Sequence, residues 1–391
     1  MILPEDFIAL MREHLGDGQA EALFNGLQQP STVSVRFNPL KTANLTLNRE
    51  ALGDPVPWCP DAYYLDGRKA FTFDPLFHAG AYYVQDASSM YLAEILRKYL
   101  HGVDGTDESN GQKESLVALD ACAAPGGKST LLAAYLPKGS MLISNEPIHK
   151  RAQVLAENMQ KWGSPNSYVT NNFPQDFGHL RSTFDFILTD VPCSGEGMFR
   201  KDETAIREWS LENVRKCAER QRDILQAIMP TLKPDGLLVY STCTFNRIED
   251  EEQVQWLVSE YGLQLLEERH FFPGRDRGEG LYMAALRKPE FDAAVPSRSL
   301  NSLKSLRTIE PQLIIDPEAP VVELNYVQAI AYLRREALHL EAPRGMVTVT
   351  YCGVPLGPAK SVGTRLNNLY PQEWRIRTTF NPIEPRPNFF M

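Results

Sequence analysis

The segment LDACAAPGGKS at residues 119–129 decides the fold, because an apolar run leads through a glycine-rich turn into a helix-forming stretch. Small residues let the backbone approach a ligand, and a helix start offers free N–H groups to a carboxylate or phosphate. A P-loop requires glycine where Cys122 stands, and the dinucleotide fingerprint G-x-G-x-x-G is absent. A turn that only links a strand to a helix therefore stays open as an alternative to a ligand site.

Short apolar runs recur downstream of this segment, with intervals long enough for helices. The runs cover residues 116–119, 141–144, 186–189 and 237–240. This alternation predicts an α/β fold with a Rossmann-like, doubly wound, mostly parallel sheet. We expect Gly236 to end a helix over 211–232 and open the next strand, and residues 281–286 to form a final edge strand.

Composition changes along the chain predict four parts. They are a small mixed N-terminal unit at 1–80, the α/β domain at 81–288, a proline-rich linker at 289–322 and a C-terminal module at 323–391. The polar run at 101–114 predicts an exposed loop. Residues 324–391 carry eight Lys and Arg against four acids, whereas the whole chain has a net charge of -9. A cationic tail on an acidic body favours a polyanionic partner, although a solvated surface of uneven charge is the plainer alternative.

The overall composition excludes several classes of protein. With 391 residues, of which 43% are hydrophobic and 23% charged, the chain is globular and long enough for two or three domains. Its six cysteines form no CxxC pair, which indicates reduced intracellular thiols. We find no signal peptide and no apolar run long enough to span a membrane, so we expect a cytoplasmic protein.

Four side chains follow the predicted strands where parallel strands would end together. Glu146 follows the run at 141–144, Asp190 and Cys193 follow the run at 186–189, and Cys243 follows the run at 237–240. Ligands bind at this edge of doubly wound sheets, and an acid after the second strand suits ribose hydroxyls. A single exposed glutamate or a buried cysteine would be unremarkable. Two cysteines at adjacent strand ends favour chemistry instead.

Two thiols and an acid suit nucleophilic catalysis better than metal binding. Zinc requires four ligands, which two cysteines without neighbouring histidines do not complete. A thiol–disulfide couple is possible but would leave the glycine-rich turn unexplained. A thiolate that adds to C6 of a pyrimidine makes C5 reactive toward a methyl donor, and loss of the C5 proton then releases the thiolate.

Several motifs carry a family resemblance that covers nearly the whole chain. DVPCSG (190–195), STCT (241–244) and ACAAPGGKS (121–129) together resemble the Sun/Nop family of S-adenosylmethionine-dependent RNA cytosine-5 methyltransferases. The chain resembles its RsmF branch, which modifies small-subunit 16S ribosomal RNA, in VRFNPLK, YYVQDASSM, GEGMFRKD, RDRGEG and GVPLGPAKSVGTRLNNLYP. The resemblance implies a class I methyltransferase fold, an N-terminal RNA-binding unit and a C-terminal PUA-like RNA-binding domain.

The resemblance also implies roles for individual residues. Cys243 would be the nucleophile, Cys193 would assist product release, and Asp190 would hydrogen-bond the cytosine. Lys128 would take part in catalysis and hold the donor's methionine part. The donor site implied by the resemblance comprises Cys122, Ala123, Ala124, Pro125, Gly126, Gly127, Lys128, Glu146 and Asp190. The family usually binds adenine through an Asn-x-Asp pattern, whereas this chain has TNNF at 170–173, so Asp176 becomes a candidate replacement.

The expected partner is RNA, either ribosomal RNA or the small ribosomal subunit, bound by a monomer without metal or membrane. The enzyme can reach a cytosine only after the base has left its stack in the RNA. Contacts between the protein and RNA phosphates must offset the free energy that unstacking costs. The candidate phosphate-binding residues are Arg36, Lys41, Lys360, Arg365, Arg375 and Arg377. The alternatives are transfer RNA as the substrate, DNA or protein as the substrate, or a weakly active RNA-binding factor in ribosome assembly.

Overall fold

The computed structural model describes residues 1–100, 115–290, 300–378 and 390, so the expected loop at 101–114 lies outside the described residues. The chain forms two compact units. The first comprises Met1–Thr32, Gln85–Leu155 and Pro165–Ile309, and the second comprises Val33–Val84, Ala156–Ser164 and Glu310–Met391. The segment expected as one N-terminal unit thus contributes to both. In the described part of the chain, no helix combines the length and apolar character needed to cross a membrane.

A seven-stranded sheet forms the centre of the first unit. Its order is β6 (Ser167–Thr170), β5 (Met141–Asn145), β4 (Val117–Asp120), β7 (Phe184–Asp190), β8 (Leu232–Thr242), β10 (Leu281–Arg287) and β9 (Gln264–Phe271). The first five strands are parallel, and β10 is antiparallel to both neighbours. The predicted doubly wound α/β fold is confirmed, with the strand order reversing between β4 and β7. Such a switch point is where these sheets bind ligands.

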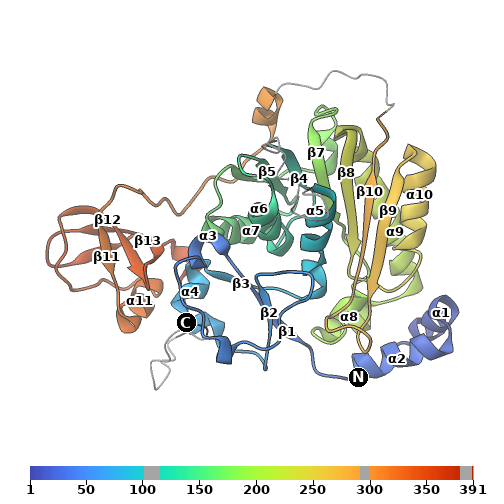
Figure 1. Cartoon of the computed structure of the whole chain (residues 1–391), viewed down its shortest axis with the longest axis horizontal. Helices are drawn as coiled ribbons and strands as arrows, with labels where there is room; N and C mark the ends of the chain where they lie inside the picture. The colour runs from blue at the N-terminus through green and yellow to red at the C-terminus, as the bar shows by residue number, and fades with distance from the viewer. Residues whose placement is uncertain (101–114, 291–299, 379–389, 391) are drawn as a thin grey trace. The chain divides into compact units, whose positions relative to one another are not determined.

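Helices cover both faces of this sheet (Figure 1). One face carries α5 (Leu92–Leu100), α6 (Gly127–Tyr135) and α7 (His149–Trp162), and the other carries α9 (Leu211–Ile228) and α10 (Glu251–Tyr261). The division between units falls within α7, after Leu155. The helices α1 (Glu5–Leu15), α2 (Asp17–Leu27) and α8 (Glu203–Glu208) complete the first unit. Phe7 of α1 packs edge-on against Phe199 and Trp209, which fixes the N-terminal helices to this unit.

Two strand predictions were wrong in detail. β8 begins at Leu232, so Gly236 lies inside the strand rather than at its start. The strand has a bulge near Asp235, whose φ is +57°. The sequence of this bulge resembles that of a helix end, which explains the wrong prediction. β10 is not an edge strand, because β9 lies outside it. β9 was not predicted, since its sequence QLLEERHF has the charged, exposed character of an edge.

The second unit contains two small sheets and a shared apolar core. The antiparallel sheet β2-β1-β3 is formed by β2 (Ala62–Leu65), β1 (Val33–Phe37) and β3 (Tyr82–Val84). The other sheet is β11 (Val321–Glu323), β12 (Gly345–Tyr351), β13 (Val354–Ser361) and β14 (Leu366–Asn368). The helices are α3 (Pro39–Thr42), α4 (Pro75–His78) and α11 (Tyr326–Leu333). Side chains from both sheets, such as Phe37 and Val349, belong to one core cluster.

Two residues expected to bind RNA phosphates are instead part of this interior. Arg36 is fully buried, with its guanidinium 4.5 Å from the ring centre of Trp162. The Lys41 ammonium donates to the carbonyl of Ala79 at 2.6 Å and to that of Lys161, and burial lowers its pKa to about 8. Neither side chain is available to a phosphate. The prediction was wrong because a single charged residue in a short strand or a short helix looks, in the sequence, like one that faces solvent.

Candidate active site

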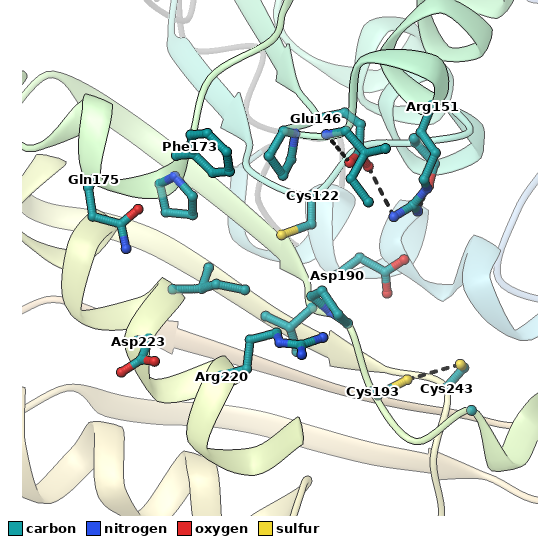
Figure 2. Close-up of a pocket in the computed structure, with 18 of the residues that line it drawn as sticks. Cys122, Glu146, Arg151, Phe173, Gln175, Asp190, Cys193, Arg220, Asp223 and Cys243 are labelled. Carbon is teal, nitrogen blue, oxygen red and sulfur yellow. Dashed lines mark hydrogen bonds and ion pairs between the residues drawn. The ribbon is translucent and has the colours of Figure 1, made fainter. Parts of the chain in front are cut away.

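A cavity of about 580 Å³ opens at the carboxyl ends of the central strands (Figure 2). Asp190 at the end of β7 pairs with Ser241 near the end of β8, and the amide of Val191 donates to the Ser241 carbonyl at 3.0 Å. This register brings Cys193 and Cys243 to the same wall of the cavity. Glu146 and Asp190 also line it, as the strand-end argument predicted, and so do Cys122 and Ala124 of the glycine-rich turn.

The glycine-rich turn is held in place by hydrogen bonds at both ends. The Ser129 hydroxyl donates to buried Asp120 at 2.6 Å, and the Ala123 amide donates to the Asn145 carbonyl at 2.8 Å. Gly126 has φ +115°, a conformation that favours glycine, and α6 starts directly after it. The Ala123 amide is thus already paired. Among the predicted turn residues, the cavity wall includes only Cys122 and Ala124.

Lys128 and Asp190 form an ion pair beside the cavity. The Lys128 ammonium lies 2.8 Å from an Asp190 carboxylate oxygen. Burial lowers the pKa of Lys128, but Asp190, with smaller contributions from Cys243 and Asp120, raises it, and the net shift is upward. Burial also raises the pKa of nearby Asp120 to about 7. Lys128 therefore stays charged and holds the Asp190 side chain in one orientation.

Glu146 is a buried carboxylate at the end of β5. It accepts the Ile148 amide at 2.9 Å, and its second oxygen lies 3.3 Å from the Arg151 guanidinium. Arg151 also donates to the Ala124 carbonyl at 3.1 Å, which ties α7 to the glycine-rich turn. Figure 2 shows Arg151 reaching toward Glu146. Arg151 was missed because one basic residue on a polar helix gives no separate signal.

The Cys193 and Cys243 sulfurs lie 3.1 Å apart, and both are free thiols (Figure 2). The hydrogen bond to Cys243 raises the pKa of Cys193 well above its ordinary value, and burial adds to this effect. Cys193 therefore keeps its proton and can donate it toward Cys243. Burial also raises the pKa of Cys122, the third thiol of the cavity, which disfavours its thiolate. This pattern favours Cys243 as the reactive sulfur.

The far end of the cavity is formed by residues that were not predicted. Phe173 and Gln175 lie away from the two cysteines in Figure 2. Phe173 is 60% exposed and Ile148 is 55% exposed, so two apolar side chains face this part of the cavity. Asp176, the suggested replacement for an adenine-binding acid, instead accepts the Phe173 amide at 2.9 Å and does not line the cavity. Three polar residues of η4 (Pro174–Phe177) and α9 also line the wall, namely Gln175, Arg220 and Asp223.

The cavity residues fit S-adenosylmethionine. Ligand sites commonly measure about 300–1,000 Å³, and this cavity lies within that range. Buried Glu146 offers acceptor oxygens where ribose hydroxyls are bound in such folds. Ile148 and Phe173 offer apolar surfaces to a flat adenine ring.

We expect Gly280→Ala to disturb the segment after Cys243. Gly280 has φ +113°, and an added Cβ would lie 2.2 Å from a ring carbon of buried Phe245. Overpacking of this kind costs about 1–3 kcal/mol, and a misplaced nucleophile costs about 100-fold in rate. Gly262→Ala is the matched control, because its φ is +64° but nothing lies within 4 Å. Equal melting temperatures and equal methyl-transfer rates for the two variants would contradict this expectation.

Three families match successive parts of the chain. Residues 110–287 match 16S rRNA methyltransferase RsmB/F, residues 3–87 match the N-terminal domain of 16S rRNA methyltransferase RsmF, and residues 319–376 match the methyltransferase RsmF PUA domain. Among solved structures, a methyltransferase homologue from Pyrococcus horikoshii has a TM-score of 0.61 at 24% identity, covering 73% of this chain and 95% of that one. NSun6 from Pyrococcus horikoshii with SFG has a TM-score of 0.60 at 19% identity, covering 74% and 99%. Both share the fold.

Curated relatives agree with these matches. Ribosomal RNA small subunit methyltransferase F of Cronobacter sakazakii is 32% identical over 346 residues, which cover 80% of this chain and 70% of that protein. The protein of the same name from Vibrio cholerae is 35% identical over 330 residues, covering 76% and 66%. The chain thus spans roughly two thirds of the length of these relatives. It is an S-adenosylmethionine-dependent methyltransferase and belongs to the RsmB/F family of 16S ribosomal RNA methyltransferases.

Proposed function

We propose that the protein methylates C5 of a cytosine in small-subunit ribosomal RNA through a covalent adduct between Cys243 and C6. The observation that carries this proposal is the meeting of the Cys193 and Cys243 sulfurs at the wall of the cavity that also holds Glu146. C5 of cytosine is a poor nucleophile until a thiolate adds to C6. Two thiols in contact supply one group for addition and one to assist elimination.

The covalent steps involve Cys243, Cys193, the methyl donor and a base that accepts the C5 proton. The Cys243 thiolate forms a bond to C6, and the electron pair of the C5–C6 double bond becomes available at C5. Bound S-adenosylmethionine supplies an electrophilic methyl group on a positively charged sulfur. After C5 is methylated, solvent water accepts the C5 proton, the C5–C6 double bond re-forms, and the C6–S electron pair returns to Cys243. Cys193, which keeps its proton, assists this release.

We assign the remaining site residues by their position on the cavity. Asp190, oriented by Lys128, accepts hydrogen bonds from the cytosine. Glu146 accepts hydrogen bonds from the ribose hydroxyls of the donor, and Cys122 and Ala124 of the turn contact its methionine part. Ile148 and Phe173 take the place of an adenine-binding acid by packing against the adenine ring. The wall is acidic at Glu146 and Asp190, which suits a cationic sulfonium.

The C-terminal sheet offers a basic surface for RNA. Met346 and Lys360 lie opposite each other on β12 and β13, and Lys360 lies opposite Asn367 on β14. Arg344 directly precedes β12 and Arg365 directly precedes β14, and the Arg344 side chain lies beside Gly363 of the connection between β13 and β14. Arg365 donates to Asn367 at 2.9 Å, and all three cations are exposed. We call Arg344, Lys360 and Arg365 the basic patch and propose that it contacts RNA phosphates.

Removing the basic patch is expected to weaken RNA binding. We expect the triple variant R344A/K360A/R365A to bind small-subunit RNA at least about tenfold more weakly, with a salt slope reduced by about 2, since each phosphate contact contributes about 0.7–0.9. The control K138A/R215A/K216A removes the same charge from exposed positions of the first unit. Filter binding at several salt concentrations measures both slopes. Equal salt slopes for the two variants would show that the basic patch does not contact RNA.

The proposed function is tested by methyl transfer to defined RNAs. Purified protein, labelled S-adenosylmethionine and small-subunit ribosomal RNA are expected to give 5-methylcytosine, which bisulfite sequencing locates. Assembled small subunits and transfer RNA are assayed in parallel. Label in transfer RNA alone would overturn the ribosomal assignment, and label on another atom would overturn the C5 chemistry. The monomeric state and the cytoplasmic location expected from the sequence stay predictions.

A further inference from the structure

The segments after the two cysteines are held together by buried polar contacts. Cys193 is followed by η5 (Glu196–Met198), and Cys243 is followed by Phe245 and Asn246. The Gly197 amide donates to the Cys243 carbonyl at 2.7 Å, so one segment binds directly to the backbone of the other cysteine. This single bond does not explain why the segments contain fully buried glutamates.

Glu249 is the first of these carboxylates. It is fully buried and accepts the Ser194 amide at 3.0 Å, the Gln221 side-chain amide at 2.8 Å and the Asn246 side-chain amide at 3.0 Å. It also accepts the Ser194 hydroxyl. Glu249 therefore joins the residue directly after Cys193 to the segment after Cys243 and to α9.

Glu196 is the second, and it is also fully buried. One of its oxygens accepts the Phe245 amide at 2.6 Å. The other accepts the Trp209 indole N–H at 2.9 Å and the Asn246 side-chain amide at 2.8 Å. The Asn246 amide nitrogen thus donates to both carboxylates, and the two networks become one.

All donors in these contacts are neutral. A buried carboxylate destabilises the folded protein unless hydrogen bonds or an opposite charge compensate for the loss of water. Burial raises the pKa of both glutamates, that of Glu196 to about 7. All four carboxylate oxygens accept hydrogen bonds, so an amide in place of either carboxylate would set an N–H group against another donor. The network requires acceptors at every position, which glutamate supplies and glutamine does not.

We propose that Glu196 and Glu249 are positioning residues that hold the segments after Cys193 and Cys243 so that the two sulfurs meet. Neither carboxylate lines the cavity, so they act through the thiols rather than on RNA or donor. Only the expected effect of these residues on methyl transfer rests on the proposed function, since the contact between the two sulfurs can be measured without RNA or donor.

The direct test is cross-linking of the two thiols in the full chain. Diamide, an azo oxidant, takes two electrons and two protons from the thiols, so that an S–S bond forms and the azo group becomes a hydrazine. Peptide mass spectrometry measures the rate at which the Cys193–Cys243 disulfide appears. We expect E196Q and E249Q to form it at least about tenfold more slowly than wild type, the loss expected for one or two hydrogen bonds to a charged group. E212Q is the control, because Glu212 is exposed on α9 and pairs with Lys216.

A second variant covers the case in which a glutamine variant does not fold. N246A removes the N–H groups that bridge the carboxylates, together with the side-chain carbonyl that accepts the Glu249 amide at 3.0 Å, and is expected to slow cross-linking several-fold. Kinetic assays are expected to show kcat about 10- to 100-fold lower in E196Q and E249Q, with the donor KM within about twofold of wild type. Unchanged cross-linking rates in folded variants overturn the inference. If the wild-type protein methylates no RNA but the variants still cross-link more slowly, the proposed function is wrong and the inference holds.

Discussion

Replacing Cys243 with alanine is expected to abolish methyl transfer to RNA while the donor still binds. Loss of a covalent nucleophile commonly lowers kcat by at least about 10⁴-fold. The residues proposed to bind the donor, such as Glu146 and Ile148, are other residues of the cavity wall, so calorimetry is expected to give a donor Kd within about twofold of wild type. Radiolabelled methyl incorporation measures the loss.

The control for this substitution is Cys352→Ala, which removes a thiol from a turn of the second unit. It is expected to retain wild-type methyl transfer. Incorporation that persists in Cys243→Ala and disappears in Cys193→Ala would reverse the roles of the two thiols. The chemistry would then resemble that of enzymes whose nucleophile follows a proline, as Cys193 follows Pro192.

Replacing Cys193 with alanine is expected to trap the enzyme on its RNA. Addition by Cys243 and methylation of C5 can still occur, but elimination loses the neighbouring thiol that lies 3.1 Å away. The adduct is expected to accumulate as a band of reduced mobility on denaturing gels when RNA and donor are both present. The double variant C193A/C243A lacks the nucleophile and serves as the control. If Cys193→Ala gives no shifted band and turns over normally, Cys193 has no part in release.

The parallel sheet and the meeting of the thiols could be predicted from the sequence because both follow from local patterns. Strands buried on both faces appear as short apolar runs, and parallel strands end at one edge. The same reasoning placed Glu146, Asp190, Cys193 and Cys243 together, and the cavity contains all four. Side chains that follow strand ends are therefore the most predictable part of the site.

Other features could not be predicted because they depend on tertiary packing. Glu196 and Glu249 are acids that become fully buried only when two distant segments meet, and isolated acids normally indicate solvent. Arg36 is similar, since its burial requires Trp162 from α7. Phe173 and Gln175 enter the cavity through η4 (Pro174–Phe177), whose short turn carries no periodic pattern.

The placement of the reactive thiols in the sheet bears on how the enzyme could be re-engineered. β7 lies between β4 and β8, and β8 lies between β7 and β10, so both sulfur-bearing turns leave interior strands. Interior strands of a sheet unfold only together with large parts of the domain. Substitutions in the turns that follow these strands are therefore poorly tolerated. Libraries that seek new RNA targets would therefore do best to keep both turns and diversify Arg220 and Asp223, which line the cavity from α9.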